Sequence, residues 1–221
     1  MEMNNKIYFD QYQTLIFDCD GVILNSNRIK TQAFYDVAKI YGHKPAQILK
    51  EYHVQNGGIS RYKKFEYLLV NILQKPLESQ ELKKLLSNFS KEVKTALLVC
   101  EVAKNIKELR DKTKNTKWLI VSGGDQTELR DVFKQRGLDI YFDGGIFGSP
   151  DDKNTILKNE TKNRNIIGKS LFLGDSMYDY QAANTAKMDF IFISKWTEVK
   201  DWKKWICENE ITNFNNIESI A

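Results

Sequence analysis

The sequence predicts an α/β protein with a doubly wound parallel sheet and a small all-helical domain. From about residue 102 onwards, short apolar runs that are typical of buried strands alternate with amphipathic segments. A further apolar run lies at Thr14–Phe17, and the stretch after it has helical periodicity without a convincing strand. Strands that alternate with helices form parallel sheets. We therefore expect the sheet domain to comprise residues 1–24 and 100–221, and the helical domain to comprise residues 25–99.

The N-terminal half supplies the first strand and the helical domain. The run Thr14–Phe17 ends in Asp18-Cys19-Asp20-Gly21, and an apolar run bounded by a turn signal is a candidate buried strand. Apolar residues at spacings of three and four then predict helices over 28–41, 46–56, 61–74 and 79–98. Glycine and proline residues separate these helices, at Gly42, Gly57-Gly58 and Pro76.

The C-terminal half supplies the rest of the sheet. Strands are predicted at 118–121, 140–142, 170–173 and 190–193, and helices over 102–112, 125–136, 152–162, 178–186 and 199–209. The helix that starts at Asp125 has a capping signal, because Glu128 follows three residues later, and Gly137 ends the helix. The segment 143–150 is predicted to be a loop.

Composition limits the class of protein. Of the 221 residues, 42% are hydrophobic and 28% are charged, as in ordinary globular proteins. The apolar runs are too short to span a bilayer, residues 1–6 lack the apolar core of a signal peptide, and the three cysteines are scattered. We therefore expect a cytoplasmic protein with no membrane contact.

The net charge of +4 is mild but unevenly distributed. Residues 25–100 contain 13 Lys and Arg against 6 Asp and Glu, which would attract an anionic substrate or simply form a solvated helical surface. The basic residues are dispersed and no nucleic-acid-binding signature accompanies them, so nucleic acid is not expected as a partner.

Conspicuous polar residues follow three of the predicted strands. Asp18 and Asp20 follow the first, Ser122-Gly123-Gly124 follow the second, and Asp175 and Asp179 follow a third. Ligands of open α/β sheets bind beyond the carboxyl ends of the strands, so these residues are expected at one edge. Clustered carboxylates repel one another unless a cation lies among them, and oxygen ligands with an incoming phosphate favour Mg²⁺. The sequence therefore predicts a magnesium site formed by Asp18, Asp20, Asp175 and Asp179.

The same residues predict phosphoryl transfer. A carboxylate can attack phosphorus and form an aspartyl-phosphate, and a bound metal would neutralise both the carboxylates and the incoming phosphate. Ser122 and the backbone N–H groups of Gly123 and Gly124 lie in a predicted strand-to-helix turn, which suits phosphate oxygens. Lys153 would add a positive charge from the next loop.

Four segments resemble the motifs of the haloacid dehalogenase-like superfamily. They occur in the order of the family's motifs from about Thr14 to Ile193, as Asp18-Cys19-Asp20-Gly21-Val22, Val121-Ser122-Gly123-Gly124, Lys153 and Gly174-Asp175-Ser176-Met177-Tyr178-Asp179. The resemblance implies a Rossmann-like catalytic core with a helical cap inserted after the first motif, as in β-phosphoglucomutase and phosphoglycolate phosphatase.

The resemblance also implies a role for each motif residue. Asp18 would be the nucleophile and a magnesium ligand, and Asp20 would be the general acid and then the base, with its main-chain carbonyl on the metal. Ser122 would hydrogen-bond the phosphoryl group, and Lys153 would balance the charge of Asp18 and the phosphate. The two remaining carboxylates, Asp175 and Asp179, would ligate magnesium, the second of them directly or through water.

The predicted cap would read the part of the substrate that is not phosphate. Gly57-Gly58-Ile59-Ser60-Arg61 resembles the cap loop that reaches the active site in these relatives, which makes Arg61, and then Lys64, candidate substrate-binding residues. Arg61 is equally compatible with a solvated residue at a helix start. The stretch Glu51–Leu69 also resembles caps of phosphatases associated with surface-polysaccharide synthesis.

Three functions agree with these residues. The first is a magnesium-dependent phosphatase for a small phosphorylated metabolite, such as a sugar phosphate or a related polyol or amine phosphate. The second is a phosphomutase of the β-phosphoglucomutase type. The third is a catalytically silent phosphate-binding module, against which the complete set of motifs argues.

Overall fold

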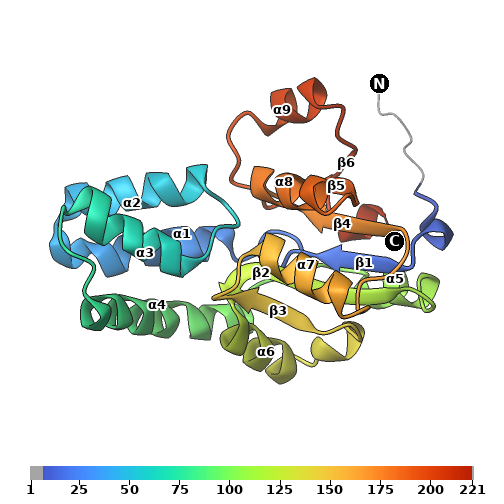
Figure 1. The fold of residues 1–221 in the computed structure, drawn as a ribbon, viewed down its shortest axis with the longest axis horizontal. Helices are drawn as coiled ribbons and strands as arrows, with labels where there is room; N and C mark the ends of the chain where they lie inside the picture. Colours follow the sequence, from blue (N-terminus) through green and yellow to red (C-terminus); the bar gives the residue numbers. More distant parts are fainter. Residues whose placement is uncertain (1–6, 221) are drawn as a thin grey trace.

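A computed structural model describes residues 7–220 and contains one six-stranded parallel sheet (Figure 1). The strand order is β3-β2-β1-β4-β5-β6, the order of doubly wound sheets, so the predicted fold class is confirmed. The strands are β1 (Thr14–Phe17), β2 (Lys117–Asp125), β3 (Ile146–Ser149), β4 (Ser170–Gly174), β5 (Asp189–Ile193) and β6 (Asn213–Phe214).

Helices surround this sheet and form a separate group between β1 and β2. That group comprises α1 (Asn27–Ala38), η2 (Lys39–Tyr41), α2 (His43–Gln55), α3 (Arg61–Tyr67), the π-helical turn η3 (Leu68–Ile72) and α4 (Ser79–Val99). The others are η1 (Phe9–Gln11), α5 (Ile106–Lys112), α6 (Gln126–Gln135), η4 (Asp139–Tyr141), α7 (Lys153–Lys162), α8 (Met177–Thr185), α9 (Trp202–Glu208) and η5 (Ile217–Ser219). Within residues 7–220, no helix combines the length and the hydropathy that a bilayer crossing requires.

Both faces of the sheet are buried, which explains why its strands are continuous apolar runs. Side chains alternate along β1, so Leu15 and Phe17 join one core cluster and Ile16 joins another. The first cluster includes buried residues of α5 and α6, and the second includes buried residues of α7 and α8. Helices therefore cover both faces of the sheet.

The helical segment, defined here as residues 27–99, extends from one end of the sheet domain (Figure 1). Leu85, Phe89, Val93 and Leu97 are buried along α4 at intervals of four residues, as expected for a helix with one apolar face. Phe34 of α1 packs against Phe89, with 4.3 Å between the ring centroids. The core of the segment is continuous with the first cluster of the sheet, so the segment is packed onto the sheet domain rather than merely tethered to it.

One predicted strand was wrong. Residues 139–141 form the 3-10 turn η4, and β3 lies in the segment 146–149, which was predicted to be a loop. Ile140 is exposed, whereas Phe142 packs edge-on against Phe17 without any strand pairing of its own. The segment that pairs with β2 is instead β3, in which Ile146 lies opposite Ile120 of β2. The apolar character of 140–142 thus reflects aromatic packing, not backbone pairing.

Candidate functional site

The structure brings the predicted polar residues together at the carboxyl ends of β1, β2 and β4. β1 pairs with both β2 and β4, so Asp18 and Asp175 lie on neighbouring strands at the point where the strand order reverses. A cavity of about 60 Å³ lies here between the sheet domain and the helical segment. Its wall includes Asp18, Asp20, Gly123, Gly124 and Asp175 from the sheet domain and Lys30, Arg61 and Lys64 from the helical segment.

Three buried carboxylates form an acidic cluster at the floor of this site. Asp18, Asp175 and Asp179 each offer an oxygen atom, and these atoms lie within 4.8 Å of one another. Burial raises the pKa of Asp18 to about 7, and the negative charges of Asp179 and Asp20 add to this effect. Burial and the charge of Asp18 raise the pKa of Asp175 well above its ordinary value. A hard divalent cation would relieve this repulsion, and the all-oxygen donor set fits Mg²⁺.

Lys153 is the buried counter-charge of this cluster. It begins α7, is fully buried, and forms ion pairs with Asp18 at 3.0 Å and with Asp179. Burial alone would lower the pKa of Lys153, but the two carboxylates outweigh it and raise that pKa. Asp179 is itself fixed by a capping box with Ser176, whose N–H and hydroxyl both donate to the same carboxylate oxygen. Asp179 thus has both oxygens engaged, and it orients Lys153 toward Asp18.

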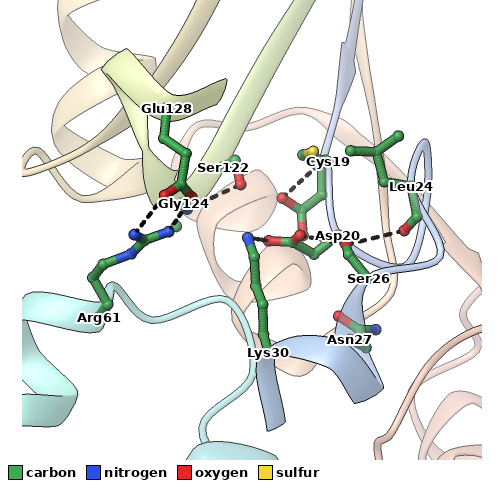
Figure 2. A network of polar contacts seen from close by, with 12 residues as sticks. Cys19, Asp20, Leu24, Ser26, Asn27, Lys30, Arg61, Ser122, Gly124 and Glu128 are labelled. Atoms are coloured by element: carbon green, nitrogen blue, oxygen red, sulfur yellow. Dashed lines mark hydrogen bonds and ion pairs between the residues drawn. The ribbon is translucent and has the colours of Figure 1, made fainter. Parts of the chain in front are cut away.

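Asp20 is held by residues of the helical segment's first turns. Lys30 of α1 lies 2.6 Å from one carboxylate oxygen, and the Ser26 hydroxyl donates a 2.5 Å hydrogen bond to the other (Figure 2). Burial would raise the pKa of Asp20, but the charge and hydrogen bond of Lys30 outweigh it and lower that pKa. Asp20 is therefore ionised here, and its side chain stands outside the acidic cluster.

Ser122, Gly123 and Gly124 were predicted to lie in a turn after the strand, but they lie within β2, which runs to Asp125 and shifts its register with β3 between Val121 and Asp125. Ser122 is fully buried, and its hydroxyl accepts a 3.1 Å hydrogen bond from the Gly124 N–H (Figure 2). A side chain at Gly123 would place its Cβ 2.1 Å from the carbonyl oxygen of Gly58 in the loop between α2 and α3. Glycine at position 123 is thus needed for the helical segment to approach this closely.

Arg61 is bound inside the protein rather than free in the cavity. Its guanidinium donates two hydrogen bonds to Glu128 of α6, at 2.5 and 3.0 Å (Figure 2). It donates a third to Ser90 at 2.9 Å. The pair is buried and joins the helical segment to the sheet domain. The structure therefore gives Arg61 a second role, as a tether between the two parts of the chain.

Lys64 is the other predicted substrate residue, and its surroundings differ. Its side chain is 1% exposed and lines the cavity, and its Nζ lies 2.7 Å from Nδ1 of His53 and over the ring of Phe34. Burial, followed by the charge of Lys30, lowers the pKa of Lys64 to about 7. Among residues 7–220 no carboxylate lies within ion-pair distance of this amine.

Lys64→Met is expected to flatten the pH dependence of stability above neutral pH. The pKa of Lys64 is lowered from its ordinary 10.5 to about 7 in the folded protein. Between these values the unfolded chain binds a proton that the folded chain does not, so the wild-type protein gains about 1.4 kcal/mol of stability per pH unit as the pH rises. The variant lacks this gain. Urea denaturation from about pH 7.5 to 9.5 measures the slope.

The matched control for that measurement is Lys63→Met. Lys63 is the next residue along the chain, its side chain is 72% exposed, and its partner is Glu66. Its variant should keep the wild-type slope. Parallel stability curves for the wild type and Lys64→Met would show that the Lys64 amine is hydrated in the folded protein.

Several residues of the site were missed from the sequence. They are Asn27, which donates a 2.6 Å hydrogen bond to Asp175, together with Lys30, His53, Glu128 and Glu198. Lys30 had a detectable signal, because it lies on the same helical face as Ala33, Phe34 and Val37, all buried. His53 is half-buried in the wall of the cavity, with its ring against Phe34.

Comparison with protein families gives one match. The model of the haloacid dehalogenase-like hydrolases matches residues 15–193, which include all four predicted motifs. No curated protein sequence matches the chain.

Solved structures with the same fold have low sequence identity. A β-phosphoglucomutase of Clostridium difficile has a TM-score of 0.69 at 15% identity, covering 95% of this chain and 93% of its own. A HAD hydrolase of family IA, variant 3, from Entamoeba histolytica has a TM-score of 0.70 at 14% identity, covering 94% and 97%. A predicted phosphoglycolate phosphatase of Haemophilus somnus has a TM-score of 0.64 at 18% identity, covering 83% and 85%.

Proposed function

The chain belongs to the haloacid dehalogenase-like hydrolases, and from this premise we propose that it is a magnesium-dependent phosphatase that acts through an aspartyl-phosphate on Asp18. One observation carries the proposal. The buried carboxylate cluster that contains Asp18, its counter-charge Lys153 and the nearby Asp20 converge at one cavity. Clustered groups with opposed pKa shifts are typical of catalytic sites.

In the first half-reaction, a carboxylate oxygen of Asp18 attacks phosphorus and forms the acyl-phosphate bond. The bond from phosphorus to the leaving oxygen breaks, and that oxygen takes a proton from Asp20. Lys153 balances the charge that the phosphoryl group adds beside Asp18. The Ser122 hydroxyl and the N–H groups of Gly123 and Gly124 would bind the phosphoryl oxygens, and for this the Gly124 N–H would have to leave the Ser122 hydroxyl to which it donates in the structure.

In the second half-reaction, water attacks and frees Asp18 and inorganic phosphate. Asp20 is now the ionised form and takes a proton from that water, which restores the acid for the next cycle. The pairing of Asp20 with Lys30 favours this ionised form.

The fit of the donor set supports a resident Mg²⁺. Asp18, the main-chain carbonyl of Asp20 and Asp175 would hold it, and Asp179, whose oxygens are engaged, would support it through Lys153 or water. When bound, the cation neutralises negative charge on the carboxylates and the phosphate.

The substrate we propose is a small phosphorylated metabolite, namely a sugar phosphate or a related polyol or amine phosphate, with surface-polysaccharide synthesis as one setting. Residues 1–24 and 100–221 would form the catalytic core, and residues 25–99 would form a cap whose closure expels water. Gly123 and Gly124 would contact the phosphate, and Lys64, with Arg61 beside it, would contact the rest of the substrate. The proposed location is the cytoplasm, with no membrane or nucleic-acid partner.

A phosphomutase is the second candidate function, and the structural likeness to a β-phosphoglucomutase is the observation that favours it. Both reactions use the same nucleophile and differ in whether water or a sugar hydroxyl accepts the phosphoryl group. Phosphorus NMR of the products separates them, because the phosphatase releases inorganic phosphate and the mutase returns an isomerised sugar phosphate.

Removal of magnesium tests the proposal. We expect a chelator to reduce phosphate release from a panel of phosphate monoesters by at least about 10²-fold, because the acidic cluster then keeps its repulsion and the phosphate loses its neutralising charge. Added Mg²⁺ should restore release and Ca²⁺ should not, since Ca²⁺ prefers more ligands and longer bonds. Release that is unaffected by chelation would contradict the proposed metal dependence.

A further inference from the structure

Four buried cationic side chains surround the catalytic carboxylates, and three of them already have a carboxylate partner. Lys30 is paired with Asp20, Arg61 with Glu128, and Lys153 with Asp18 and Asp179. The fourth, Lys64, has only the ring of His53, with 2.7 Å between Nζ and Nδ1. Across residues 7–220, Lys64 is thus the one lysine or arginine of the cavity wall that lacks a carboxylate partner.

The surroundings of Lys64 make this lack of a partner costly. The side chain is 1% exposed, so water does not replace the missing anion. Phe34 lies beneath the amine, and His53 stacks on the same ring at 4.5 Å between centroids. A buried charge is destabilising unless an opposite charge accompanies it, so this position favours the entry of an anion from the cavity.

Lys64 lines the cavity from the helical segment, whereas Asp18, Gly123 and Gly124 line it from the sheet domain. Ser122, Gly124 and Lys153 belong to the sheet domain, whereas Lys64 lies on α3 of the helical segment. Because Lys64 and Asp18 line the same cavity from different parts of the chain, a substrate whose phosphate lies beside Asp18 can present its leaving group to Lys64.

We infer that the substrate is a phosphate monoester whose leaving group carries a carboxylate, and that the Lys64–His53 pair is the specificity-determining element that binds this carboxylate. The inference rests on the proposed phosphatase function and narrows its substrate class to phosphorylated hydroxy acids. His53 acts as a positioning residue, because its ring nitrogen holds the amine toward the cavity. A singly charged carboxylate fits better than a second phosphate, since Asp20 and Glu198 also line this small cavity and would repel a dianion.

Two matched pairs of substrates test the inference. Racemic 3-phosphoglycerate and racemic glycerol 1-phosphate differ only by a carboxylate in place of a hydroxymethyl group, and 6-phosphogluconate and glucitol 6-phosphate differ in the same way at a greater length. For at least one pair, we expect the wild-type enzyme to prefer the carboxylate in kcat/KM by at least about tenfold, the factor expected of one charge-assisted hydrogen bond. In Lys64→Met and Lys64→Gln this ratio should fall to about one, while the Lys63→Met control keeps it.

Each other outcome overturns the inference in a distinguishable way. A wild-type ratio near one for both pairs would show that no carboxylate is recognised, although the phosphatase function would stand. A ratio that survives Lys64→Met would place carboxylate recognition elsewhere, and an equal loss on both members of a pair would place Lys64 on the transferred phosphate. If none of the four is hydrolysed but p-nitrophenyl phosphate is, in an Asp18-dependent manner, only the substrate class is wrong. If that ester is also inert, the proposed function fails as well.

Discussion

Asp18→Asn is expected to lower phosphatase turnover by at least about 10⁴-fold, because the amide that replaces the carboxylate is a poor nucleophile toward phosphorus. The measurement is magnesium-dependent phosphate release at saturating substrate. Asp131→Asn is the matched control, since Asp131 lies on α6 with a side chain that is 42% exposed, and its partners within residues 7–220 are Lys94 and Gln135. Wild-type turnover in Asp18→Asn would remove the assigned nucleophile.

Asp18→Asn is also expected to have a characteristic effect on the stability of the folded protein. Burial and the neighbouring Asp179 and Asp20 raise the pKa of Asp18, which means that its charge is unfavourable in the metal-free fold. We therefore expect metal-free Asp18→Asn to unfold at the same or a higher urea concentration than the wild type. An inactive variant that is as stable as the wild type separates loss of the nucleophile from loss of the fold.

Lys153→Met should lose both activity and stability. Lys153 is fully buried between Asp18 and Asp179, and its removal leaves two buried carboxylates without their counter-charge. Breaking a buried ion pair by removal of one partner costs about 3–5 kcal/mol, and phosphoryl transfer loses its charge balance as well. Urea denaturation and phosphate release measure the two effects.

The control for this second variant is Lys158→Met, one and a half turns further along α7 and exposed to solvent. It should resemble the wild type in both assays. If Lys153→Met were as stable as the wild type, the buried ion-pair network around Asp18 would be absent in solution. The opposite stability changes of Asp18→Asn and Lys153→Met, measured without metal, are a stronger test than either alone.

The sequence was sufficient to predict the sheet and the acidic cluster because both depend on local patterns. Asp18 and Asp175 directly follow apolar runs, and the carboxyl ends of parallel strands meet at one edge whatever the details of packing. The incorrect prediction at β3 arose where the local apolar pattern is ambiguous. Two short apolar segments, 140–142 and 146–149, are candidates for one position in the sheet; the second pairs with β2, and Phe142 of the first packs against aromatic rings instead.

The wall of the cavity could not be predicted in this way. The contacts of Lys30, His53 and Lys64 depend on how the helical segment sits against the sheet domain. That placement is set by contacts between distant residues, such as Arg61 with Glu128 and the close approach of Gly58 to Gly123. No spacing within one helix specifies such pairs.

The ion pair between Asp20 and Lys30 links the position of the helical segment to the protonation of Asp20, the proposed general acid and base. Asp20 follows β1 of the sheet domain, whereas Lys30 belongs to α1, so the 2.6 Å contact spans the boundary between them. A rotation that withdrew Lys30 would remove this counter-charge and let water reach Asp20, so the pKa of Asp20 would rise toward its ordinary value. Asp20 would thus take up a proton more readily when the helical segment is open than when it is closed, where Lys30 keeps the carboxylate ionised.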